Sequence, residues 1–148
     1  MEINTVKTTI ICIIGIIGST IAQLLGGFDM ALQTLVIFMA VDYITGLIVA
    51  GVFKKSKKTD TGALESRAGW KGLCKKGVTL LIVLVATRLD MLIGSNFIRD
   101  AVVIGYVANE ALSIFENVGL MGINVGAPLT NAIDILKKKA ESEGDKIE

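Results

Sequence analysis

Asp42, Arg88, Asp90 and Glu110 are ionisable residues that interrupt long runs of apolar residues. If these runs cross a membrane, each charge at a helix centre costs about 2.5 to 3.5 kcal/mol on insertion scales, and such residues are typical of ion pairs, proton relays and voltage sensors. At about 1.5 Å per residue, Asp42, Arg88 and Glu110 fall within one helical turn of the bilayer midplane, with Asp90 slightly further out. The spacing therefore predicts an Asp42–Arg88 ion pair between antiparallel neighbouring helices.

This layer carries more negative than positive charge, because Asp42, Asp90 and Glu110 face a single arginine. At least one carboxyl is therefore expected to be protonated, or water must reach the layer. Either outcome would couple the protein to protons or to the membrane potential, in which one elementary charge is worth about 2.3 kcal/mol per 100 mV.

A polar stripe accompanies the last of these acids. Asn109, Ser113 and Asn117 recur at four-residue intervals, and Glu110 and Glu116 flank them. Residues four apart share one face of a helix. A stripe of this length indicates a surface that faces water or a partner subunit, and with the midplane charges it forms the candidate pore or trigger site.

Small residues recur at the same spacing in the first half of the chain. Gly15 and Ser19 form one such pair, and Gly46 and Ala50 follow Asp42 on one face. Small residues let helix backbones approach closely in membranes. We interpret these positions as helix-packing sites, either within one chain or between copies.

The composition argues against catalysis and metal binding. The chain has no histidine, which removes the commonest general base and metal ligand. Its two cysteines, Cys12 and Cys74, form no CxxC motif, and no P-loop, GxGxxG or nucleophile elbow occurs. We therefore expect no catalytic residue, metal site or cofactor, and no nucleic-acid partner.

Hydropathy predicts the fold class. Hydrophobic residues make up 52% of the 148 residues and charged ones 20%, against about 25% in soluble domains, and the mean hydropathy is +0.65. A globule of this size has too little interior to bury that much apolar surface. We expect an all-α, polytopic membrane protein, a single membrane domain over residues 1–148. The four predicted transmembrane spans are 8–28, 30–53, 77–94 and 101–120. Three spans are the alternative, if the third or fourth segment lies in the interface or the first is a removed signal peptide.

Positive charge is concentrated in the loop at 54–76. The cations of this loop are Lys54, Lys55, Lys57, Lys58, Arg67, Lys71, Lys75 and Lys76. The turn between the first two spans has none, and the turn between the last two has only Arg99. The positive-inside rule therefore predicts a multi-pass protein of the bacterial cytoplasmic membrane with both termini in the cytoplasm.

The second half of this loop has the pattern of an amphipathic cytoplasmic linker helix. Arg67, Lys71 and Lys75 recur every four residues, and Trp70 lies on another face. Such a helix would lie at the interface and bind anionic headgroups, whereas the alternative is a solvated loop that only enforces orientation. The predicted headgroup-binding residues are Arg67, Trp70, Lys71, Lys75 and Lys76. The polar segment 135–148 is predicted to be a short charged C-terminal tail.

Three segments resemble those of a known family. SRAGWKGLCKKGVTLLIVLVATRLD (66–90) is similar to the Gly-x-x-Lys-Lys and apolar-helix signature of the phage lysis and toxin-secretion holins of Gram-positive systems, bacteriophage holin family 4. NEALSIFEN (109–117), followed by Gly119 and Gly122, resembles that family's Asn-Glu-x-x-Ser-Ile-x-Glu-Asn block, and VDYITG (41–46) its first acidic helix.

The resemblance implies a holin, which is not an enzyme. Such proteins oligomerise in the membrane and open timed lesions that release an endolysin or a large toxin, so it implies homo-oligomers, a functional link to an endolysin and an antiholin as a further partner beside membrane lipids. The alternatives are a small ion- or proton-coupled transporter that uses the same carboxylates as a relay, and a membrane scaffold subunit that docks through the basic loop.

Overall fold

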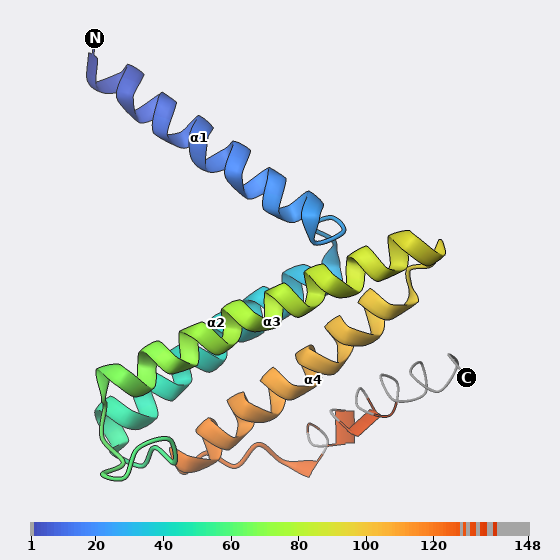
Figure 1. The fold of residues 1–148 in the computed structure, drawn as a ribbon. Coiled ribbons are helices and arrows are strands. Elements are labelled where there is room, and N and C mark those ends of the chain that lie inside the picture. The colour runs from blue at the N-terminus through green and yellow to red at the C-terminus, as the bar shows by residue number, and fades with distance from the viewer. Residues whose placement is uncertain (1, 128, 130, 133, 136–137, 139–148) are drawn as a thin grey trace.

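The computed structural model describes residues 2–127, 129, 131–132, 134–135 and 138, and over these residues the regular secondary structure is helical. The helices are α1 (Glu2–Leu24), α2 (Met30–Ile48), α3 (Ser66–Ile93) and α4 (Phe97–Leu120) (Figure 1). The prediction of an all-α protein is confirmed for this part of the chain. The predicted charged tail, 135–148, falls largely outside the described residues.

Helix α1 extends away from the other three helices (Figure 1). Its isoleucines are exposed, Ile11 by 68% and Ile16 by 67%. Ser19 is exposed as well, and no other residue comes within 4 Å of a Cβ built at Gly15. Within the described chain, Gly15 and Ser19 therefore make no helix–helix contact, and their packing against another copy stays a prediction.

Helix α2 begins at a side-chain cap. Asp29 Oδ1 accepts a hydrogen bond from the amide of Leu32 at 2.9 Å, which satisfies one of the free donors at the helix start. At its other end α2 continues into a π-helical turn, Val49–Phe53, and Lys54 ends it in the left-handed conformation with φ of 52°. The helix therefore occupies the whole predicted span 30–53.

Two described stretches, Asn4–Leu24 and Met30–Phe53, are long and apolar enough to cross a membrane. They correspond to the first two predicted spans. The third and fourth predicted spans form α3 and α4, which are more highly charged.

Helix α3 continues through Gly77, the predicted start of the third span. The predicted linker helix and the third predicted span are one continuous helix of 28 residues, which at about 1.5 Å per residue is about 42 Å long. The predicted start followed the lysines that precede Gly77. The backbone does not break there, because lysine is a good helix former.

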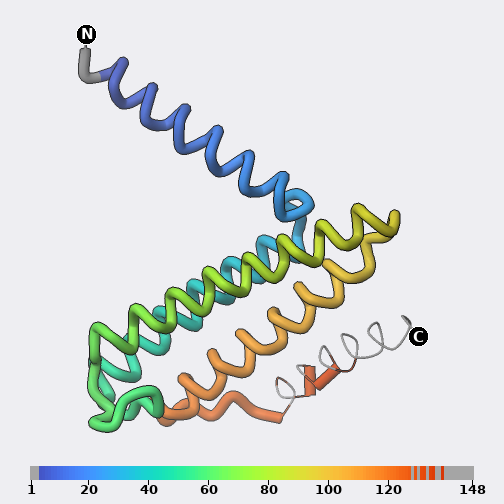
Figure 2. The backbone as a smooth tube through the Cα atoms, viewed as in Figure 1, coloured from blue at the N-terminus to red at the C-terminus, as the bar shows by residue number. Residues whose placement is uncertain are grey.

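Helices α2, α3 and α4 form a bundle in which α4 makes the most extensive contacts, with α2 and then with α3. Its apolar core contains Leu25, Leu32, Leu35, Met39, Val83, Val103 and Val107. Figure 2 shows that the α2–α3 loop and the end of α4 lie at one end of the bundle, and the turns after α1 and α3 at the other.

Arg99, at the start of α4, joins the two turns at that second end. Its Nε donates to the carbonyl of Leu25 at 2.8 Å, and its guanidinium also contacts Asp29 Oδ2 at 2.7 Å and the carbonyl of Gly27 at 3.3 Å. The hydrogen bond from Arg99 lowers the pKa of the Asp29 carboxyl below its usual value. Arg99 therefore anchors the end of α1 and the start of α2 to α4.

Asp90 completes the turn between α3 and α4. Its Oδ1 accepts from the Ser95 hydroxyl at 2.5 Å and the Ile98 amide at 3.0 Å, and its Oδ2 accepts from the Arg99 amide at 2.7 Å. The first amides of a helix lack intrahelical partners, so Asp90 caps α4 from the preceding helix. This carboxylate, predicted near the midplane charges, thus lies at the end of the bundle.

We predict that Gly26→Ala destabilises the protein more than Gly27→Ala. Both glycines have positive φ, 88° and 102°, where alanine costs about 1 to 2 kcal/mol. A Cβ at Gly26 would lie 2.7 Å from Arg99 Nε, whereas nothing lies within 4 Å of one at Gly27. Since hydrogen bonds fix Arg99, the clash should cost roughly 1 to 3 kcal/mol more. Denaturation in detergent, followed by circular dichroism, measures the free energy of unfolding of both variants. An equal loss of stability in the two would contradict the anchoring role of Arg99.

Candidate functional site

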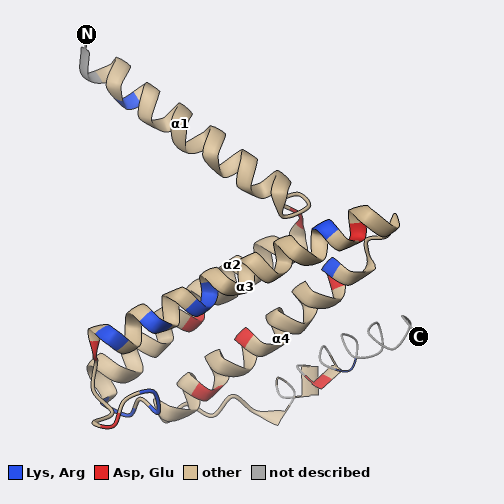
Figure 3. Cartoon of the chain, viewed as in Figure 1, with Lys and Arg blue, Asp and Glu red and all other residues tan. Residues whose placement is uncertain are grey.

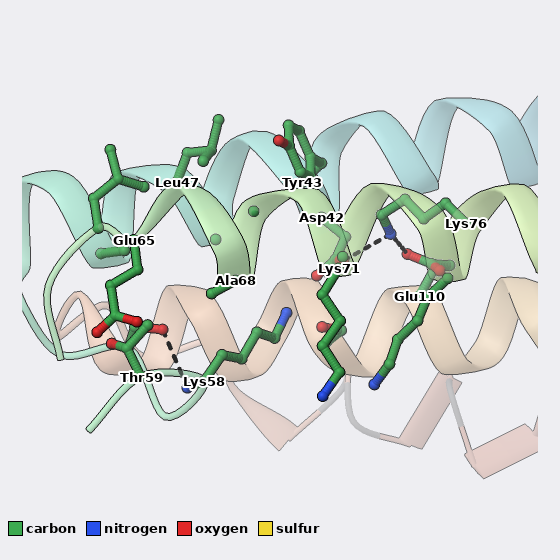
Figure 4. Close-up of a pocket in the computed structure, with 18 of the residues that line it drawn as sticks. Asp42, Tyr43, Leu47, Lys58, Thr59, Glu65, Ala68, Lys71, Lys76 and Glu110 are labelled. Carbon is green, nitrogen blue, oxygen red and sulfur yellow. Dashed lines mark hydrogen bonds and ion pairs between the residues drawn. The ribbon is translucent and has the colours of Figure 1, made fainter. Parts of the chain in front are cut away.

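Asp42, Lys76 and Glu110 form a charged triad that joins α2, α3 and α4. The Lys76 ammonium lies 2.8 Å from Asp42 Oδ2 and 2.5 Å from Glu110 Oε2 (Figure 4). The Lys76 side chain is 13% exposed and each of the two carboxylates 8%. One ammonium therefore bridges two carboxylates on different helices in the interior of the bundle.

Asn117 of α4 holds the second oxygen of Asp42. Its Nδ2 donates to Asp42 Oδ1 at 3.1 Å and lies 3.0 Å from Thr45 Oγ1. A Cβ at Gly46 would stand 3.7 Å from this Nδ2, in ordinary van der Waals contact. The small residue at position 46 thus faces Asn117 at the α2–α4 contact, where Ala50 is also buried.

The triad has a net charge of −1 when all three groups are ionised. Charge-assisted hydrogen bonds are stronger than neutral ones, and two of the three ammonium donors are used in them. Removing one member of a buried ion pair leaves an uncompensated charge and costs about 3 to 5 kcal/mol. The triad is therefore an interaction whose loss should separate the helices.

The predicted Asp42–Arg88 pair is not formed. Asp42 pairs with Lys76, and Arg88 is exposed with a contact to Met91 Sδ at 3.6 Å. The prediction placed the start of the third span at Gly77, but α3 begins eleven residues earlier. Arg88 lies twelve residues after Lys76, about 18 Å further along the helix, and so lies at a different depth from Asp42.

The predicted polar stripe of α4 divides between two environments. Asn117 is buried in the hydrogen bonds to Asp42, and Asn109 and Ser113 line a cavity next to the triad. Glu116 is exposed. The structure thus brings Asp42, Glu110 and Asn117 together and leaves Glu116 outside this cluster.

The cavity has a volume of about 480 Å³ and lies between α2, α3, α4 and the α2–α3 loop (Figure 4). The triad forms part of its wall, and Lys71 and Lys75 of α3 line it as well. Arg67 and Trp70 are exposed on α3 and do not line it. The residues predicted to bind headgroups therefore have three locations: the exposed surface, the cavity and, for Lys76, the triad.

Positive charge is concentrated at one end of the bundle. Figure 3 shows lysines and arginines along the first half of α3 and in the preceding loop. Within the described residues, no group of three or more cysteine, aspartate or glutamate side chains is arranged to hold a metal ion. Chemically, the site can hold ionised side chains of different helices in ion pairs, and it can release or exchange those pairs when the helices move.

The comparisons with known proteins identify the family. The family model for bacteriophage holins matches residues 19–138. The chain belongs to the bacteriophage holin family. A probable holin of Bacillus phage phi105 is 31% identical to this holin-family chain over 116 residues, 78% of this chain and 80% of the phage protein. An uncharacterized protein of Listeria innocua is 39% identical over 93% of this chain and 94% of its own length. No solved structure matches this holin-family chain.

We predict that Lys76→Met lowers the free energy of unfolding by about 3 kcal/mol or more, because two buried carboxylates lose their only shared cation. Arg88→Met is the matched control, since it removes an exposed cation from the same helix and should change stability by about 0.5 kcal/mol or less. Chemical denaturation in detergent, followed by circular dichroism, compares the two. A larger loss for Arg88→Met would mean that the triad does not hold the bundle.

Proposed function

We propose that this protein acts as a holin that accumulates in the bacterial cytoplasmic membrane, oligomerises and opens timed lesions. The lesions release an endolysin, or in some systems a large toxin, to the cell wall. Membership of the bacteriophage holin family is the observation that carries the proposal, and the similarity to the probable holin of Bacillus phage phi105 supports it.

In the proposed topology all four helices cross the membrane. The α2–α3 loop and both termini then lie in the cytoplasm, as the lysine and arginine distribution predicts. The clustering of polar anchors supports this arrangement, because Arg99 with Asp29 lies at the end of the bundle opposite the basic loop. The partners in this proposal are membrane lipids, further copies of the chain, an endolysin and an antiholin.

The triad supplies a mechanism for timing. While Lys76 bridges Asp42 and Glu110, the charges of the triad stay paired inside the bundle. When the triad opens, these charges and the buried amide of Asn117 need water, because unpaired charges are costly in hydrocarbon. Several copies that turn these faces toward one another would line an aqueous lesion. Neutral replacement of Asp42 or Glu110 is accordingly expected to shift the time of lysis without preventing membrane insertion.

Helix α1 has a different part in this mechanism. Its apolar side chains are exposed on all sides, and it joins the bundle only near Leu25. Since most of its side chains are exposed within the described residues, α1 is available to contact other copies through Gly15 and Ser19, residues that allow close backbone approach.

Induced expression in a bacterium tests the proposed function, with and without a co-expressed endolysin that has no export signal. We predict an abrupt fall in culture turbidity only when both proteins are present, and membrane permeabilisation with growth arrest when the chain is expressed alone. A saturable substrate flux without permeabilisation would identify a transporter instead. Absence of any leak at confirmed membrane levels would favour a scaffold and contradict the proposal.

A further inference from the structure

The cavity beside the triad is lined by further lysines besides Lys76. Lys58, Lys71 and Lys75 line it, and none of them forms an ion pair within the described residues. Of the carboxylates in the wall, Asp42 and Glu110 are already bonded to Lys76. Glu65, the third, accepts a hydrogen bond from the Thr61 hydroxyl at 3.3 Å. Positive charge is therefore in excess where the free lysines lie.

The loop that carries Lys58 is folded back on itself. The Ser56 amide donates to the Gly62 carbonyl at 3.0 Å, and the Lys58 amide donates to Ser56 Oγ at 3.2 Å. Gly62 has a φ of 72°, and a Cβ there would collide with the Lys54 carbonyl. These contacts fold the loop on itself, and Lys58 of the loop and Lys71 of α3 line the same cavity from different elements (Figure 4).

Apolar side chains form the remaining wall. Leu47 of α2, Ala50 of the π-helical turn, Ala68 of α3 and Leu64 of the loop line the cavity, and Leu64 is 55% exposed. The volume of about 480 Å³ lies within the range of about 300 to 1,000 Å³ that is usual for small-ligand sites. A ligand that fits this lining has an anionic group for the lysines and an apolar portion for the leucines.

We propose that this cavity binds the phosphate of an anionic phospholipid headgroup, with Lys58, Lys71 and Lys75 as its cationic contacts. Basic pockets between membrane helices on the cytoplasmic side bind anionic headgroups by this chemistry. The inference rests on the proposed membrane orientation, which places the cavity at the cytoplasmic leaflet, and does not depend on lesion formation. Since the site adjoins the triad, a bound lipid contacts α2, α3 and the loop together and stabilises the closed bundle.

Isothermal titration calorimetry of the detergent-solubilised full chain tests the site. The ligands are short-chain phosphatidylglycerol, short-chain phosphatidylcholine and inorganic phosphate. We expect saturable binding of one phosphatidylglycerol per chain, and binding at least about tenfold weaker for the other two, because phosphatidylcholine has no net charge and phosphate has no apolar portion.

Variants assign the binding to the cavity. The triple variant Lys58→Gln, Lys71→Gln, Lys75→Gln should bind phosphatidylglycerol at least about tenfold more weakly, since each lysine near the headgroup is worth roughly fivefold in affinity. The matched control, Lys54→Gln, Lys55→Gln, Lys57→Gln, removes the same charge from loop residues that do not line the cavity and should bind as the unmodified chain does. If the triple variant unfolds, the single variant Lys58→Gln, which alters only the loop, tests the same site. Its affinity for phosphatidylglycerol should be about fivefold weaker than that of the unmodified chain.

Three results would overturn the inference. If the control variant binds phosphatidylglycerol as weakly as the triple variant, binding depends on diffuse surface charge and not on the cavity. If phosphatidylcholine binds as tightly as phosphatidylglycerol, the lysines confer no selectivity, and if inorganic phosphate does, the ligand is a free phosphate rather than a lipid. The lysis experiment is independent of these titrations. Lysis without lipid binding contradicts only this inference, and lipid binding without lysis contradicts only the proposed function.

Discussion

The bridge from the Lys76 ammonium to Asp42 and Glu110 is the interaction on which the rest of the bundle depends. It is the point at which α2, α3 and α4 meet through charge. In an apolar surrounding, each of these groups alone would be costly. Together they compensate one another, so the arrangement is stable only while the three helices stay in contact.

Two polar clusters hold the bundle at different heights, with apolar core residues between them. At the end with the α1–α2 and α3–α4 turns, Arg99 and Asp90 fix the turns that follow α1 and α3. Near the middle of α2 and α4, the triad is backed by Asn117 and adjoins the lysine-lined cavity. In the proposed mechanism, charge sensing at the triad and lipid contact in the adjoining cavity use one region of the bundle, and contact between copies uses α1.

The sequence predicted the helical class and two stretches long and apolar enough to span a membrane, and it singled out Asp42, Glu110 and Asn117, which the structure brings together, because apolar runs and isolated acids are local signals. It predicted the wrong partner for Asp42. Lysines next to an apolar run indicate a membrane boundary, and only the contact between helices shows that Lys76 is buried while Lys75 is exposed. A usable signal existed in the spacing, since Lys76, Thr79, Val83 and Ala86 follow a three-and-four repeat along the buried face of α3. The roles of Arg99 and Asp90 required the tertiary structure, because their partners lie on other elements.

If the triad holds the closed state, as we propose, its loss in Lys76→Met should change the time at which lysis begins. Expression of this variant and of Arg88→Met with an endolysin, at membrane levels matched by immunoblot, allows the onset times to be compared with that of the unmodified chain. We expect earlier lysis for Lys76→Met, because the ion pairs of α3 with Asp42 of α2 and Glu110 of α4 are lost at once, and an unchanged onset for Arg88→Met. An unchanged or later onset for Lys76→Met at equal membrane abundance would contradict this proposal.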